Sequence, residues 1–190
     1  MHRPVIALLL WFAASFAWAQ TPTPGERIRN EWVEVQVPAT PGWRLAPPSP
    51  GRIALARPGR EPDDSFAGFA LVFRIEQPRD REHFLEIVRT GAAADTPPQR
   101  FTERQVDIRH DDARSSWCVR LAAVHDDRQA RLRSGGTGTL TLQALTLYCL
   151  HPREPGLAVA VGFSHRGLGL HPDFDTEAGA FIDAARILDR

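Results

Sequence analysis

Four strand-like segments follow one another in the second half of the chain, and this run constrains the fold more than any other feature of the sequence. Three of the four segments are rich in apolar residues, and short connectors rich in Asp, Ser, Gly and Pro, which favour turns, separate the segments. The segments are residues 101–110, 117–125, 138–150 and 157–164. Because consecutive strands with such short connections pair with each other, the run predicts an antiparallel meander.

Three further strands are predicted ahead of this run, at residues 32–37, 52–56 and 65–75. In the first, Val33, Val35 and Val37 alternate with polar residues, which is the period-2 signature of a strand with one buried face. The third is almost continuously apolar from Phe66 to Phe73, as expected of a central strand covered on both faces.

Two helices complete the pattern. The first is predicted over residues 83–89, between Asp80, which can cap its start, and Gly91, which is expected to end it. The second is predicted over residues 176–188. Its expected buried face consists of Ala178, Phe181, Ile182, Ala185 and Leu188.

The order of elements, three strands, a helix, four strands and a helix, predicts an α+β fold. We expect an antiparallel sheet of about six to seven strands with helices packed on it, as an α/β/α sandwich. A chain of 190 residues suits one compact domain. The predicted organisation is a signal peptide at residues 1–19, a flexible lead-in at 20–30 and a single domain at 31–190.

The N-terminus has the pattern of a secretory signal. The basic residue Arg3 precedes an apolar run at residues 5–16, and the small residues Ala17 and Ala19 predict cleavage between Ala19 and Gln20. The apolar run is shorter than the roughly 18 residues that a spanning helix needs, so an uncleaved membrane anchor is the weaker interpretation. We therefore expect a bacterial periplasmic protein that is not inserted in the membrane after cleavage.

The only two cysteines, Cys118 and Cys149, lie on neighbouring predicted strands. If they pair, the register places the centre of the hairpin between Arg133 and Ser134, beside the turn-forming Gly135 and Gly136. A disulfide suits an exported protein, and the chain has no C-x-x-C spacing that would indicate a redox or metal site. A structural disulfide is therefore predicted.

Charge and composition exclude several classes of protein. The chain has 23 basic and 23 acidic residues, so it lacks the positive excess that a nucleic-acid-binding protein uses to displace counterions. All the basic residues are arginine. Without lysine the chain cannot form a Walker-type phosphate loop, a Schiff base or a Ser-Lys dyad.

Two His-Asp-Asp triplets begin at His110 and His125 and suggest metal ligands. A strand of about 30 Å separates the triplets, at roughly 3.3 Å per residue, so one ion cannot bridge them. The better candidate cluster is His125, Asp126, Asp127, His165 and His171. The predicted register places His125 and His165 on opposite faces of the sheet unless a bulge intervenes, and residues of these types at strand ends are usually turn residues.

A serine or cysteine hydrolase is not expected. Residues 162–167 resemble a nucleophile elbow, but Arg166 stands where that motif needs glycine, and Ser164 and His165 would point to opposite faces. A different candidate site is the tip of the hairpin, where Arg128, Arg131 and Arg133 could bind an anion or a protein partner.

The order of elements resembles that of a known fold. The residues that carry this resemblance follow one another along the chain: a strand that ends in Val-Pro, then Gly42-Trp43-Arg44-Leu45, an apolar strand with Phe66 and Phe69, one helix, the four-strand meander and a C-terminal helix with Phe181 and Ile187-Leu188. It is similar to the Mog1/PsbP-like α/β/α sandwich, whose bacterial periplasmic members include the DcrB-like group. The resemblance implies an accessory or binding module and carries over no catalytic residue.

Three functions follow as hypotheses. The first is a non-enzymatic periplasmic module for a protein or envelope partner, including an immunity-type protein that neutralises a toxin. The alternative is a periplasmic metal-binding protein or metal-dependent enzyme centred on His125 and His165. The third is a small-molecule binder that uses the space between sheet and helices.

Overall fold

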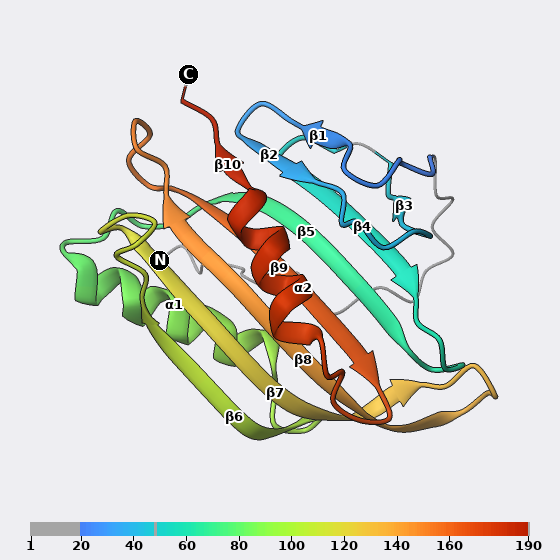
Figure 1. Cartoon of the computed structure of the whole chain (residues 1–190). Helices are drawn as coiled ribbons and strands as arrows, with labels where there is room; N and C mark the ends of the chain where they lie inside the picture. Colours follow the sequence, from blue (N-terminus) through green and yellow to red (C-terminus); the bar gives the residue numbers. More distant parts are fainter. Residues whose placement is uncertain (1–19, 48, 190) are drawn as a thin grey trace.

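A seven-stranded antiparallel sheet forms the centre of the molecule (Figure 1). The computed structural model describes residues 20–47 and 49–189, so the predicted signal peptide and its cleavage point after Ala19 lie outside the described residues. Across the sheet the strands are ordered β3-β4-β5-β9-β8-β7-β6. Their bounds are β3 Arg44–Leu45, β4 Arg52–Pro58, β5 Ser65–Arg74, β6 Phe101–His110, β7 Cys118–Arg131, β8 Thr137–Leu150 and β9 Leu157–Gly167. The predicted antiparallel sheet and its four-strand meander are thus confirmed.

Helix α1, Arg81–Asp95, connects β5 to β6 and lies on one face of this sheet (Figure 1). Its buried side chains are Phe84, Leu85, Val88 and Gly91. They pack against Val119, Leu121, Ala123, Tyr148 and Ala160 of the sheet, and these residues together form the α1-side core. The Asp80 carboxylate accepts a hydrogen bond of 2.8 Å from the backbone N–H of His83, which confirms Asp80 as the N-cap.

Helix α2, Phe174–Ala184, covers the opposite face of the sheet together with a small three-stranded sheet. The strands of the small sheet are β1 Arg27–Arg29, β2 Val33–Gln36 and β10 Arg186–Ile187. Phe163 of β9 is fully buried at the centre of this α2-side core. Its ring centroid lies 5.7 to 6.3 Å from those of Trp43, Phe66, Phe174 and Phe181.

The small sheet differs from the expected arrangement in two ways. The predicted strand at residues 32–37 buries Val33, Val35 and Val37 as expected, but it belongs to the small sheet and not to the large one. The segment predicted as a lead-in contributes β1, which pairs with β2, and Gln20 forms a bridge with Leu45. Through these pairings, the segment predicted as a flexible lead-in is hydrogen-bonded to the rest of the fold from residue 20 onwards.

Both helices end at places that differ from the predictions. α1 continues past Gly91 to Asp95, and Gly91 is buried within it. α2 begins at Phe174 and ends at Ala184, where the chain turns extended at Ala185 and forms β10. β10 pairs with the open side of β2, and the N–H of Leu188 donates to the carbonyl of Trp32 at 2.8 Å. This pairing satisfies backbone groups that a longer helix would have bonded internally.

The predicted disulfide is present. Cys118 and Cys149 are cross-strand partners on β7 and β8, bridged with an S–S distance of 2.02 Å. The predicted register holds from this pair to Asp127 opposite Leu140, after which a bulge between Asp127 and Ala130 shifts it by one residue. Among the described residues, neither helix is long and apolar enough to cross a membrane.

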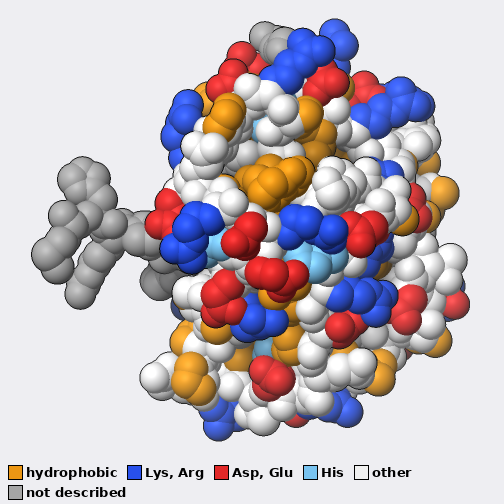
Figure 2. All heavy atoms as spheres, turned by 90° about the vertical axis from the view of Figure 1, so that its left-hand side faces the viewer, with side chains coloured by type: hydrophobic (Ala, Val, Ile, Leu, Met, Phe, Trp, Pro, Cys, Tyr) orange, Lys and Arg blue, Asp and Glu red, His pale blue; other side chains and the backbone are white. Residues whose placement is uncertain are grey.

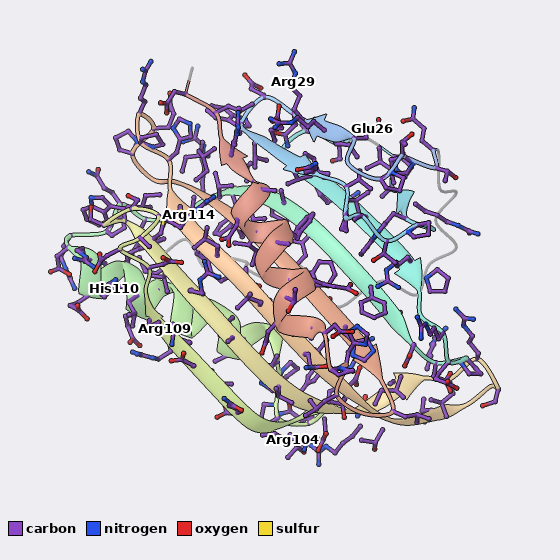
Figure 3. All side chains as sticks on the ribbon, viewed as in Figure 1. Glu26, Arg29, Arg104, Arg109, His110 and Arg114 are labelled. Carbon is purple, nitrogen blue, oxygen red and sulfur yellow. A yellow bond between two sulfur atoms is a disulfide. The ribbon has the colours of Figure 1, made fainter. Side chains whose placement is uncertain are left out.

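Side chains from the β6–β7 end of the sheet hold both helices in place (Figure 3). His110, at the end of β6, lies 3.0 Å from the Glu82 carboxylate in the first turn of α1. Arg114, in the loop that follows, donates to the carbonyl of Ala185 at 2.8 Å, just after the end of α2. The end of β6 and the loop that follows it therefore contact the helices on both faces of the sheet.

Candidate functional site

An apolar cavity of about 440 Å³ lies between α1 and the large sheet. Its floor is formed by side chains of β4 to β9, and its wall by the C-terminal half of α1. Arg89, Ala93 and Glu103 line it and are exposed, so the cavity opens to solvent. A volume in this range is typical of sites that hold a small organic ligand.

The cavity exists because the sheet presents a row of small side chains where it lies. Cross-strand register aligns Ala56, Ala67, Ser164, Ala144 and Ala123 into one continuous row over five strands. The helix opposite contributes Ala92 and Ala93, which are equally short. Short side chains on both sides cannot fill the gap that the α-carbon positions leave, so the space stays open.

Phe69 forms an aromatic wall of the cavity by lying across Gly162, its cross-strand partner. A Cβ atom at residue 162 would stand only 2.2 Å from the Phe69 ring and 2.9 Å from the Thr146 hydroxyl oxygen. Glycine is therefore needed at residue 162 to let the ring lie flat against the sheet.

A second apolar cavity of about 170 Å³ shares Phe69, Leu71, Tyr148 and Ala92 with the first. The two cavities together show that α1 spans an apolar groove and fills it only in part. Tyr148 is buried beneath the helix, and this burial raises the pKa of its phenol far above its usual range. The Tyr148 hydroxyl is therefore a neutral polar group inside an apolar space.

One end of the large cavity carries a buried ionic cluster. Asp127 is 0% exposed, and its two oxygens accept hydrogen bonds of 2.7 Å from Nε and from a terminal nitrogen of Arg100. Arg166, which lines the cavity, approaches the same carboxylate to 3.3 Å. Burial alone would raise the pKa of Asp127, but the bonds from Arg100 and the charges of both arginines outweigh it and lower the pKa.

His125 also lines this end of the cavity, with the Phe101 ring edge-on at 6.1 Å. Burial lowers the pKa of His125, although the negative charges of Glu103 and Asp126 act in the opposite direction. The imidazole is therefore neutral at neutral pH and adds no charge beside Arg166.

The predicted metal cluster is divided between the two faces of the sheet. His125 faces the cavity, whereas His165 lies on the α2 side against Phe66 and His171, with ring centroids 4.7 and 5.3 Å away. This is the separation that the predicted register gave. Among the described residues, no group of three or more His, Cys, Asp and Glu side chains could hold a metal ion.

The three arginines of the predicted hairpin tip have different surroundings. Arg128 donates from its backbone to the carbonyl of Arg100 and from its guanidinium to that of Pro98. Arg131 and Arg133 are exposed, and the backbone N–H of Arg133 donates to Asp63 at 2.7 Å. The tip therefore rests against the β4–β5 loop, and its role in binding a partner stays a prediction.

Charges on the surface are mixed. On the face shown in Figure 2, positive and negative side chains lie next to each other around a small apolar patch. A scan against protein-family models and a search of curated proteins find no match to this chain. The argument for function therefore depends on the site itself.

Proposed function

We propose that this protein is a non-enzymatic binding module of the bacterial periplasm, and that its ligand is an apolar or amphiphilic component of the cell envelope held between α1 and the sheet. The observation that carries the proposal is the cavity of about 440 Å³, with its floor of small and apolar side chains. The signal-peptide pattern at residues 1–19 and the disulfide support export.

Two features favour binding over catalysis. Ser164 lines the cavity, but its neighbour His165 lies on the opposite face of the sheet, so this histidine cannot act as its base. The ionic cluster at the end of the cavity is formed by a carboxylate already bonded to Arg100, which leaves it a weak base. Both observations suit a site that holds a molecule without transforming it.

We also propose that the chain has the Mog1/PsbP-like α/β/α sandwich fold. One helix on each face of an antiparallel sheet is compatible with that fold, and the resemblance implies an accessory or binding module. A protein partner, including the toxin of an immunity pair, would use the exposed Arg131 and Arg133 of the hairpin tip. A metal-centred function is less well supported, because His125 and His165 do not converge.

Binding of the uncharged dye Nile red to the exported form of the chain tests the cavity. We expect saturable fluorescence enhancement with one site per chain. Ala144→Phe, which fills the alanine row, should weaken binding by about tenfold or more, since it occupies the space the dye needs. Ala122→Phe, on the same sheet but the opposite face, is the matched control and should bind normally. Unsaturable binding, or equal binding by both variants, would refute the proposal.

A further inference from the structure

Two arginines share one carboxylate at the inner end of the cavity. Arg100 takes both oxygens of Asp127, and Arg166 lies at 3.3 Å from one of them. The Nε–H of Arg166 is buried and has no hydrogen-bond partner among the described residues. A buried polar group without a partner is costly, so this donor needs an acceptor that the described part of the chain does not supply.

We propose that the ligand of the cavity is an amphiphile with an anionic head group that binds Arg166, while its hydrocarbon tail runs along β8 under α1 and crosses the row of alanines at Ala144. This inference rests on the proposed function, because it names the chemical class of the molecule that the cavity holds.

The charge balance of the cluster supports an anionic head. Two guanidinium groups and one carboxylate leave one positive charge without a counter-charge in the cluster. The side chains of Arg100 and Arg166 are only 25% and 27% exposed, so water compensates this charge incompletely. Two further carboxylates line the cavity. Glu103 is exposed at the rim, where water solvates it, and Asp95 lies on the α1 wall near Tyr148, at the end away from Arg166. The cross-strand partners of Arg166 are Ser65 on β5 and Leu142 on β8, and neutral His125 lines the same end of the cavity. A carboxylate, sulfonate or phosphate oxygen would accept hydrogen bonds from the exposed part of the Arg166 guanidinium and balance the charge.

The shape of the cavity supports a chain-like tail. Leu142, Ala144, Thr146 and Tyr148 follow one another on the same face of β8 and all line the cavity. These positions span about 20 Å at roughly 3.3 Å per residue, which is the length of a long alkyl chain. Phe69, Leu71 and Tyr148 lie at the far end from Arg166 and provide an apolar surface for the end of the tail.

A matched series of ligands with the same tail tests the head group. Dodecanoate, dodecanol and dodecylammonium are used to displace Nile red from the exported form of the chain. The two ionic ligands are kept below the concentration at which they form micelles, and dodecanol is kept below its solubility limit. We expect dodecanoate to bind about tenfold more tightly than dodecanol, and dodecylammonium to bind most weakly, since its charge is repelled by Arg166.

Substitution of Arg166 shows whether that side chain causes the preference. Arg166→Gln should abolish the advantage of dodecanoate and leave the affinity for dodecanol unchanged, because Arg100 still satisfies Asp127. Arg120→Gln is the matched control. Arg120 is a partly buried sheet arginine bonded to Asp111 at 2.7 Å, but it lies on the face away from the cavity, and its loss should leave the preference intact.

The outcomes separate this inference from the proposed function. If dodecanol binds as tightly as dodecanoate, or if Arg166→Gln keeps the preference, the anionic head group is wrong while the cavity remains a binding site. If no member of the series displaces the dye and the dye itself does not bind, the proposed function is wrong as well. If Arg166→Gln fails to fold, the comparison of dodecanoate with dodecanol on the unaltered chain still decides the charge of the head group.

Discussion

At the scale of single residues, the cavity depends on glycine and alanine positions as much as on the larger side chains that line it. Gly162 leaves room for the Phe69 ring, and the alanines of the neighbouring row leave room for a ligand. Gly68, the residue before Phe69, performs the same task on the other face, where a Cβ would come within 3.1 Å of the Phe181 ring. Small residues at adjacent positions of β5 and β9 thus let aromatic rings approach the sheet from both sides.

Gly162→Ala should destabilise the protein by about 1 to 3 kcal/mol, because the new methyl group overlaps the Phe69 ring and forces it to move. Urea denaturation of the variant and the parent chain measures this difference. Since Phe69 lines the cavity, the variant should also bind Nile red more weakly. The control is the double variant with Phe69→Ala, in which the methyl group has space. If the cost of Gly162→Ala is equally large in that background, the overlap with Phe69 is not its cause.

Some of the site could be predicted from single residues and some could not. The strand period places His125 and His165 on opposite faces, and this prediction is confirmed by the register. In the sequence, Arg166 stands out only as the residue that breaks a nucleophile elbow, because no local pattern indicates that it meets Asp127, which is distant in sequence. The small residues at alternate positions of the strands were a usable signal, since they indicate a sheet face that is not closely packed.

At the scale of elements, sequence located each long strand and both helices but misplaced the helix ends. Gly91 was expected to end α1, yet it is buried against the sheet, and the alanines that follow have high helix propensity. α2 stops early because the chain after Ala184 pairs with β2. Such an end depends on a distant strand with a free edge, which no local pattern reveals.

Asp80 is the residue on which the start of α1 depends. Asp80→Ala should lower the free energy of unfolding by about 1 kcal/mol, because the N–H of His83 then loses its acceptor within the first turn. Thermal or urea denaturation gives the value. Glu86→Ala, at an exposed position in the middle of the same helix, is the control and should cost less than about 0.5 kcal/mol. A similar loss in both variants would mean that the cap has no special role.

At the scale of the whole molecule, the large sheet separates two cores that serve different purposes. The α2-side core contains the fully buried Trp43 and Phe163 and the disulfide, and the small sheet adds further packing to it. The α1-side core is less completely filled, because the cavities lie there. The pairing of β5 with β9, in the interior of the sheet, joins the strands that precede α1 to the strands that follow it. Short connections in the sequence predict the order of strands within each half. They do not predict that β5 pairs with β9, because after α1 the chain could place either β6 or β9, the two outer strands of the meander, beside β5.

This division predicts that stability and binding can be changed separately. The disulfide closes a loop of 31 residues, so the double substitution Cys118→Ala and Cys149→Ala should cost about 3 to 4 kcal/mol through the greater entropy of the unfolded chain. The bridge lies in the α2-side core, on the face away from the cavity. Nile red affinity should therefore change by less than about twofold at a temperature where the variant is folded.

Urea denaturation and dye titration of the same preparations test both parts of this prediction. Ala144→Phe provides the opposite pattern for comparison, with a large loss of dye binding from a substitution on the cavity face. If loss of the disulfide weakens dye binding in proportion to stability, the two faces of the sheet are coupled and the cavity depends on the packing of both. If loss of the disulfide changes stability alone, the two faces of the sheet are independent. Substitutions in the cavity can then change ligand binding without a change in the packing of the α2-side core.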